Sequence, residues 1–108
     1  MPSIFSKIVA REIHAEIIAE GEDWMAFKDI HPKAPVHVLI IPKKEIRGIQ
    51  SAGETDKEIL GNLMLAVGQV AQNLGLAESG YRVMINQGRD GGQEVDHLHL
   101  HLLGGKKL

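Results

Sequence analysis

Histidine and leucine alternate near the end of the chain, from His97 to Leu102. Successive side chains of a β-strand point to opposite faces of a sheet, so this alternation predicts a strand with the imidazoles on one face and the leucines on the other. The leucine face belongs in a hydrophobic core. The histidine face would line a surface or a cleft.

The length and composition of the chain are those of one folded domain. Hydrophobic residues make up 44% of the 108 residues and charged residues 24%, close to the averages for globular proteins. We therefore expect a single domain over residues 1–108. The absence of cysteine excludes disulfides, thiolate metal sites and cysteine nucleophiles. A net charge of −2 lacks the basic surplus that is typical of nucleic-acid-binding domains.

No apolar run in the sequence approaches the roughly 20 residues that span a bilayer. The longest runs are residues 38–41 and 63–67, and the first residues lack the apolar stretch of a signal peptide. We therefore expect a cytoplasmic protein that binds neither a membrane nor nucleic acid.

Short β-like runs separated by turn residues predict a sheet of five antiparallel strands. The third run lies between Pro35 and Pro42 and is almost continuously aliphatic, as is typical of a central strand buried on both faces. The predicted strands cover residues 15–20, 24–28, 36–41, 81–87 and 95–103.

One long helix is predicted between the third and fourth strands. Apolar residues recur at intervals of three and four from Ile59 to Leu74, Thr55 and Glu58 have the spacing of a capping box, and Gly75 stands where a helix would end. A short helix is also predicted at residues 4–8, behind a capping Ser3. The fold class is therefore α+β, with one long helix and a short N-terminal helix on a five-stranded antiparallel sheet.

A second apolar face of the long helix carries Leu60, Met64 and Ala71. So wide an apolar stripe either lies deep in the core or meets a second subunit. A chain of this size has little core to offer, so we expect a homodimer.

The histidine cluster indicates chemistry rather than packing, because each ring that gains a proton repels its neighbours. An uncharged imidazole is available as a nucleophile near neutral pH, and flanking rings can donate to an anionic substrate, so phosphorus is the natural target. The glycine-rich turn at residues 88–92 would either offer backbone N–H groups to phosphate oxygens or serve as an ordinary hairpin turn.

A metal site is the competing interpretation of the cluster. Alternate residues of a strand are about 6.6 Å apart, so His97 and His101 would be about 13 Å apart and could not both reach one ion. A further ligand, such as His37, would have to come from another strand. We therefore predict no native metal and no cofactor, and we interpret His14 and His31 as ordinary polar residues.

The chain resembles the histidine-triad (HIT) family, and specifically its Hint-like branch of nucleoside phosphoramidate hydrolases. The resemblance rests on the triplet His97-x-His99-x-His101, on Gly104-Gly105 behind it, and on segments in matching order along the chain. Those segments are residues 4–8, 26–30, 35–43, 80–82, 86 and 90–93. The resemblance implies a HIT-like fold whose sheet continues across a homodimer, with a purine nucleoside monophosphate or its phosphoramidate bound near each triad.

The resemblance also implies roles for individual residues. His99 matches the nucleophile, His101 matches a phosphate-contacting ring, and His97 and His37 match the rings that support them. Asp29 matches the carboxylate that holds the ribose hydroxyls. The apolar base pocket is matched by Ile4, Phe5, Ile8, Phe27 and Ile30. The remaining nucleotide-binding positions are Asn86, Gly92, Gln93 and Glu94.

The implied function is hydrolysis of purine nucleoside 5'-phosphoramidates, of the AMP-amine or AMP-lysine type, through a nucleotidyl-histidine intermediate. The alternatives are a dinucleoside polyphosphate hydrolase with the same nucleophile and a weakly catalytic nucleotide-binding regulator. Three positions depart from the family. Glu94 replaces the usual Ser or Thr near the leaving group, Asp96 replaces an aromatic residue beside His97, and Glu45 replaces a histidine expected at the surface.

Overall fold

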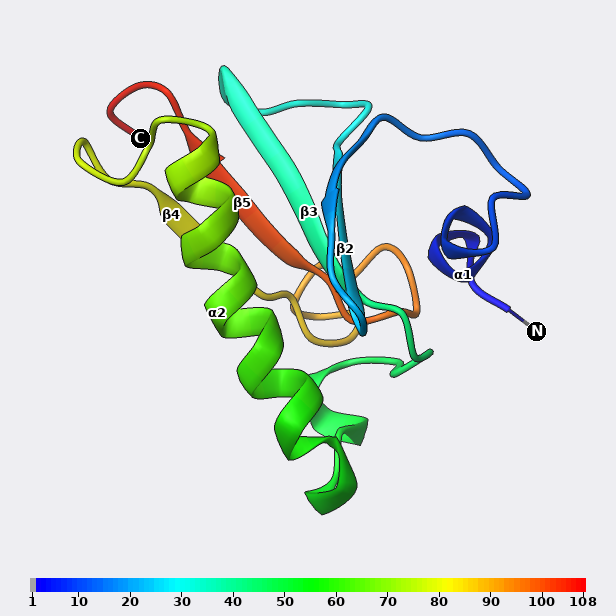
Figure 1. The fold of residues 1–108 in the computed structure, drawn as a ribbon. Coiled ribbons are helices and arrows are strands. Elements are labelled where there is room, and N and C mark those ends of the chain that lie inside the picture. Colours follow the sequence, from blue (N-terminus) through cyan, green and yellow to red (C-terminus); the bar gives the residue numbers. More distant parts are fainter. Residues whose placement is uncertain (1) are drawn as a thin grey trace.

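A five-stranded antiparallel sheet forms the centre of the structure, a computed structural model that describes residues 2–108 (Figure 1). The strands are β1 (Ile17–Glu20), β2 (Trp24–Lys28), β3 (Val36–Pro42), β4 (Arg82–Met84) and β5 (Leu100–Gly104). Their order across the sheet is β1-β2-β3-β5-β4. The predicted α+β class and antiparallel sheet are confirmed.

In the described part of the chain, two α-helices and two short 3₁₀ helices accompany the sheet. They are α1 (Ile4–Val9), η1 (Ile49–Ser51), η2 (Glu54–Asp56) and α2 (Lys57–Asn73). The predicted Ser3 cap is confirmed, since the Ser3 hydroxyl accepts the backbone N–H of Ser6 at 3.0 Å. Gly75 ends α2 with a φ of 75°, and the next N–H, that of Leu76, returns to the Ala71 carbonyl at 2.9 Å.

The capping box predicted at the start of α2 is wrong. The residue that precedes the helix is Asp56, because residues 54–56 form a 3₁₀ turn that leads into it. The Asp56 carboxylate accepts the backbone N–H of Gly53 and the ammonium of Lys44, so it closes the preceding turn rather than capping the helix.

Separate hydrophobic clusters cover the two faces of the sheet. Along β3, Val38 and Ile40 pack in the α2 cluster, whereas Leu39 and Ile41 pack with α1 on the opposite face. Figure 1 shows α2 running along one face and α1 standing apart from it. The expectation that the third strand is central and buried on both faces is confirmed.

The last strand is shorter than the predicted range 95–103, because β5 begins only at Leu100. Before that point the backbone N–H of Leu98 bonds to the Ile46 carbonyl, in the loop after β3, instead of joining a ladder. The alternation of faces nevertheless persists through this bend. The leucines 98, 100 and 102 lie in the α2 cluster, whereas His97 and His99 pack against Phe5 of α1.

The second apolar face of α2 is only partly buried. Ala71 is buried, but Met64 and its neighbour Leu65 are 59% and 75% exposed. The homodimer that this face suggested stays a prediction. No helix within residues 2–108 has the length and apolar character needed to cross a membrane.

Candidate active site

His99 lies where two cavities meet. One is an apolar slot of about 250 Å³ between α1 and the sheet, and the other is a polar cavity of about 430 Å³. Four side chains line both cavities: Asp29, Glu94, His99 and His101. A ligand with an apolar part and a polar part could therefore occupy both cavities and pass the His99 ring.

The tautomer of His99 follows from one hydrogen bond. Its Nδ1 lies 2.7 Å from the backbone carbonyl of His97, and a carbonyl can only accept, so Nδ1 carries the hydrogen. The lone pair is therefore on Nε2, for which no residue in the described range 2–108 provides a partner. The edge of the Phe5 ring packs against the imidazole, with centroids 5.1 Å apart, and holds its orientation.

His97 is fully buried and supports the site from behind. Its Nε2 donates to the Pro42 carbonyl at 2.9 Å, and its Nδ1 accepts from the Ser3 hydroxyl at 2.7 Å. Burial lowers the pKa of His97, which keeps the ring uncharged at neutral pH. His97 lines neither cavity, which fits a supporting role rather than contact with a ligand.

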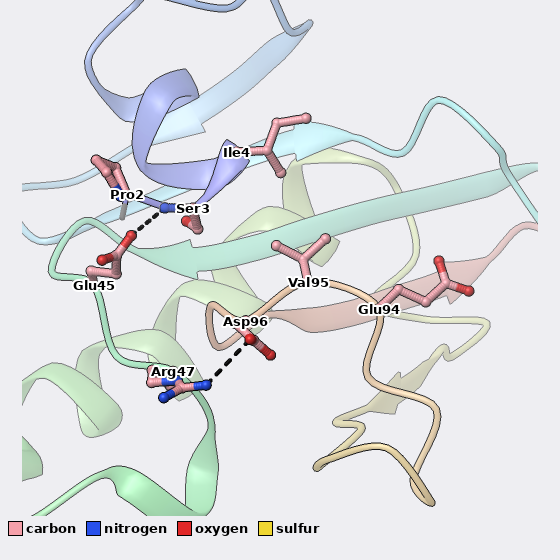
Figure 2. Close-up of a pocket in the computed structure, with 8 residues that line it drawn as sticks. All are labelled: Pro2, Ser3, Ile4, Glu45, Arg47, Glu94, Val95 and Asp96. Atoms are coloured by element: carbon pink, nitrogen blue, oxygen red, sulfur yellow. Dashed lines mark hydrogen bonds and ion pairs between the residues drawn. The ribbon is translucent and has the colours of Figure 1, made fainter.

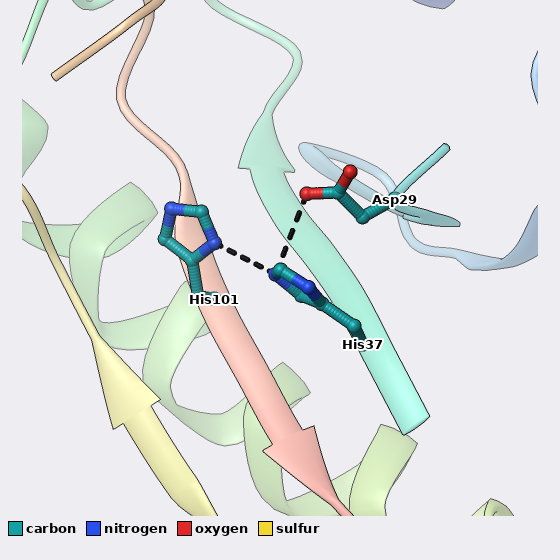
Figure 3. A group of neighbouring side chains, drawn as sticks. All are labelled: Asp29, His37 and His101. Atoms are coloured by element: carbon teal, nitrogen blue, oxygen red, sulfur yellow. Dashed lines mark hydrogen bonds and ion pairs between the residues drawn. The ribbon is translucent and has the colours of Figure 1, made fainter. Parts of the chain in front are cut away.

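A directed chain of hydrogen bonds orients His101. The Lys33 backbone N–H donates to Nδ1 of His37, so His37 carries its hydrogen on Nε2 and donates it to Nδ1 of His101 at 2.9 Å (Figure 3). His101 must then carry its own hydrogen on Nε2. Its imidazole is thus a neutral donor.

Burial lowers the pKa of His101 to about 4, assisted by repulsion from His99 and His37. Burial also lowers the pKa of His37, although the carboxylate of Asp29 opposes that shift from 3.4 Å. Both rings therefore stay uncharged at neutral pH. Asp29 is held in place by the His31 backbone N–H, which donates to its other oxygen at 2.8 Å.

The predicted base pocket coincides with the apolar slot. All five residues named from the sequence line it: Ile4, Phe5, Ile8, Phe27 and Ile30. Ile30 is 83% exposed, so it lies at the mouth. Sequence reasoning missed Ile13, Ala15, Lys28, Leu39 and Val95, and it gave His14 no role there. Leu39 could have been found from the alternation along β3.

The remaining predicted nucleotide-binding residues are only partly brought together. Asn86, Gly92 and Glu94 line the polar cavity. However, the Asn86 amide donates to the Gly91 carbonyl and the Gly92 N–H to the Arg89 carbonyl, so the turn itself uses these donors. Sequence reasoning missed Lys33 and Met84 in this cavity, and it read His31, which also lines it, as an ordinary polar residue.

Gln93 lies outside both cavities. Its side-chain amide donates to the carbonyls of Arg47 and Val95, and its oxygen accepts the N–H of Gly88. These contacts brace the loop that precedes the triad. The structure therefore gives Gln93 no place beside a ligand at His99.

Asp96, which precedes His97 in the chain, forms an ion pair away from that ring. Its carboxylate faces Arg47 at 3.3 Å, and both side chains are mostly exposed. The carboxylate that does act on the His97 ring is that of Glu45, which opposes the lowering of its pKa.

A cation could be held at only one group of side chains in the described part of the chain. One ligand atom each from Asp29, His37 and His101 lies within 4.8 Å of the others. A metal there would have to displace the hydrogen bond between the two imidazoles. His97 and His99 take no part in this group.

An antiparallel sheet that presents clustered histidines beside an apolar slot defines a site of the histidine-triad type. The profile of the HIT domain family matches residues 10–108. An uncharacterized HIT-like protein of Synechococcus elongatus is 49% identical over 106 residues, which cover 98% of this chain and 92% of that protein.

Solved structures of HIT family hydrolases have the same fold. The Legionella pneumophila hydrolase matches with a TM-score of 0.95 and 46% identity over 98% of this chain and 95% of its own. The Clostridium thermocellum hydrolase matches with a TM-score of 0.95 and 47% identity, over 98% of this chain and 92% of its own. The chain belongs to the HIT family and has the fold of its solved hydrolases.

Proposed function

We propose that the protein hydrolyses purine nucleoside 5'-phosphoramidates through a nucleotidyl-histidine intermediate on His99. The observation that carries the proposal is the free lone pair on Nε2 of His99, at the junction of an apolar slot and a polar cavity. A nucleophile in that place meets the phosphorus of a ligand whose base fills the slot.

The apolar slot supports recognition of the nucleoside. Phe5 and Phe27 pack edge to face and, with aliphatic side chains, offer flat contact to a purine without reading its edge. Asp29 lines both cavities, and a carboxylate binds the two hydroxyls of a ribose well. We therefore expect modest base selectivity and clear dependence on the ribose diol.

The polar cavity supports recognition of the phosphate. His101 offers a neutral Nε2–H to a phosphoryl oxygen, and Lys33 contributes a positive charge to the same cavity. The described residues thus supply a donor and a cation in the polar cavity beside His99.

The reaction proceeds by two displacements at phosphorus. In the first, the Nε2 lone pair of His99 forms a bond to the α-phosphorus, and the bond to the amine breaks with its electron pair, which takes a proton from solvent. In the second, water attacks the phosphorus, the bond to His99 breaks with its electrons returning to Nε2, and the proton of the water is released.

Glu94 favours an amine leaving group over a polyphosphate. Its exposed carboxylate lines both cavities beside His99 and has no counter-ion among residues 2–108. A negative charge there repels the phosphates of a dinucleoside polyphosphate and tolerates a neutral or cationic amine. A panel of adenosine phosphoramidates and diadenosine polyphosphates tests this, and faster turnover of the polyphosphates would contradict it.

We also propose that the sheet continues across a homodimer through β4. Within residues 2–108 this strand pairs only with β5, and Met84 and Ile85 at its end are 36% and 38% exposed. An unpaired edge with apolar side chains is a ready template for a second copy. Sedimentation equilibrium at micromolar concentration measures the assembly, and a monomer would contradict it.

The decisive experiment for the proposed function is the capture of the intermediate. Rapid quenching of a single turnover with an adenosine phosphoramidate, followed by mass measurement of the peptide that contains His99, should give an AMP adduct on that residue. AMP binding without any adduct and without turnover would instead favour the nucleotide-binding regulator.

A further inference from the structure

We propose that Glu45 is a positioning residue for the triad and for the apolar slot, acting through the first turn of α1. Where turnover is measured, this inference rests on the proposed function. Its structural basis does not, because it concerns contacts within the chain.

Glu45 joins the loop after β3 to the start of α1. Its Oε1 accepts the backbone N–H of Ser3 and, at 2.8 Å, the hydroxyl of Ser6. Figure 2 shows the Glu45 carboxylate directed at Ser3 on one side of a cavity, with the pair Arg47 and Asp96 on another. One carboxylate thus holds the N-cap residue and the first turn of the helix.

The helix needs such a tie because it is short. α1 has 6 residues, and isolated helices shorter than about 12 residues are marginal in water. Packing of Phe5 and Ile8 fixes one side of the helix against the sheet. Glu45 fixes its start, from a position 42 residues away in the chain.

A continuous path of contacts leads from Glu45 to the nucleophile. The Ser3 hydroxyl bonds to Nδ1 of His97, and the His97 carbonyl accepts the Nδ1 hydrogen of His99. If Ser3 moves, Nδ1 of His97 loses its hydrogen-bond partner, and the His97 carbonyl that accepts from His99 is held less rigidly. Glu45 itself touches neither cavity that meets His99.

The same tie shapes the apolar slot. Ile4, Phe5 and Ile8 lie on α1 and line the slot. A displaced first turn would widen the slot and remove the ring that orients His99. Loss of the tie should therefore raise KM and lower kcat together.

The interaction needs an acceptor oxygen rather than a charge. Both of its donors, a backbone N–H and a hydroxyl, are neutral, and a glutamine amide oxygen can accept from each. The hydrogen bonds from Ser3 and Ser6 hold the pKa of Glu45 below its ordinary value, so the wild-type side chain is ionised at neutral pH. This distinction makes Glu45→Gln a conservative variant and Glu45→Ala a disruptive one.

The experiment compares Glu45→Ala and Glu45→Gln with Glu78→Ala, an exposed glutamate in the turn after α2. Amide hydrogen exchange is read at Ser6 and Lys7, whose N–H groups bond to Ser3. In Glu45→Ala these amides should exchange about fivefold faster, as expected for loss of about 1 kcal/mol of hydrogen bonding. Glu45→Gln and Glu78→Ala should stay within about twofold of wild type.

Kinetics with an adenosine phosphoramidate provide the second measurement. Glu45→Ala should raise KM and lower kcat, each by about threefold to tenfold, and Glu45→Gln should restore both. Ser3→Ala should show similar losses, and the double variant Ser3→Ala with Glu45→Ala should lose less than the sum, because both act on the same contact to His97.

The outcomes are separable. Unchanged α1 exchange and unchanged kinetics in Glu45→Ala would overturn the proposal. Equal damage in Glu45→Gln and Glu45→Ala would overturn its hydrogen-bond basis. If the wild-type protein turns over no phosphoramidate, the proposed function fails, and the exchange of Ser6 and Lys7 alone decides whether Glu45 holds the helix.

Discussion

His37 on β3 donates its Nε2 hydrogen to Nδ1 of His101 on the neighbouring strand β5, across 2.9 Å. This contact leaves the His101 hydrogen on Nε2, where it can serve a phosphoryl oxygen. We expect His37→Leu to release the ring and lower kcat by about tenfold, less than the roughly 10²–10³-fold loss for an oxyanion-binding donor itself, because His101 remains. Steady-state kinetics against the distant control Lys57→Ala measure this, and an unchanged kcat would remove His37 from the mechanism.

The nucleophile itself is tested by His99→Ala. We expect turnover to be lost while the fold and most of the affinity for AMP remain, because the bond from His99 to phosphorus forms only during reaction. Calorimetric titration with AMP measures the affinity, and single-turnover assays measure the chemistry. Substantial residual activity would show that another group attacks phosphorus.

Stability should fall as the pH is lowered from about 6.5 to 5. Burial lowers the pKa of three histidines in the folded protein, His37, His97 and His101, with His101 reduced to about 4. In the unfolded chain a histidine gains its proton near pH 6.5, so the unfolded state binds more protons in this window and the free energy of unfolding decreases. His101 alone should contribute about 1.5 kcal/mol of this decrease.

Urea midpoints measured at pH 7, 6 and 5 follow this effect. The measurements stop at pH 5 because a second effect begins below it. Carboxylates with a lowered pKa in the folded state, such as Asp56, then take up protons, and the stability that their ionised form contributes is lost. His101→Gln should show a shallower dependence on pH than wild type. A midpoint that is flat from pH 7 to 5 would be evidence that the three imidazoles take up protons in the folded state over the same pH range as in the unfolded chain.

Glu94→Ser tests the leaving-group side of the site. Removing the carboxylate should raise the turnover of phosphoramidates. It should raise the turnover of diadenosine polyphosphates by a larger factor, because these substrates carry more phosphates for Glu94 to repel. For partly screened charges near a surface, a change of a few-fold is the expected scale. Lower phosphoramidate turnover in Glu94→Ser would show instead that Glu94 takes part, for example by delivering a proton.

Removal of metal ions should leave the activity unchanged. Every proposed step uses nitrogen and oxygen groups of the chain and of water. In the cluster of Asp29, His37 and His101, a hydrogen bond joins the two imidazoles, and a metal would break it. Exhaustive chelation followed by assay measures this, and loss of turnover that added zinc restores would overturn the metal-free mechanism.

Sequence periodicity predicted the elements in which each face keeps the same surroundings along its whole length. The alternation along residues 97–102 correctly placed the leucines in the core, and the aliphatic run on β3 correctly indicated a strand that is buried on both faces. The capping box predicted at Thr55 and Glu58 was wrong because a short polar pattern also suits a 3₁₀ turn. The Asp56 carboxylate instead accepts hydrogen bonds from Gly53 and Lys44. The family resemblance predicted every residue of the apolar slot on α1.

The amino-acid sequence by itself determined the fold class and which residues form the histidine face of the last strand. Hydrophobic alternation and helical spacing are local properties of a sequence, so both could be read without the structure. The tertiary structure alone decided which nitrogen of each imidazole carries the hydrogen. For His97 and His101 that choice depends on partners remote in sequence: Ser3 and Pro42 for His97, and His37 for His101. It also assigned Glu45 to the N-terminal helix, since a hydrogen bond across 42 residues leaves no periodic signal in the sequence.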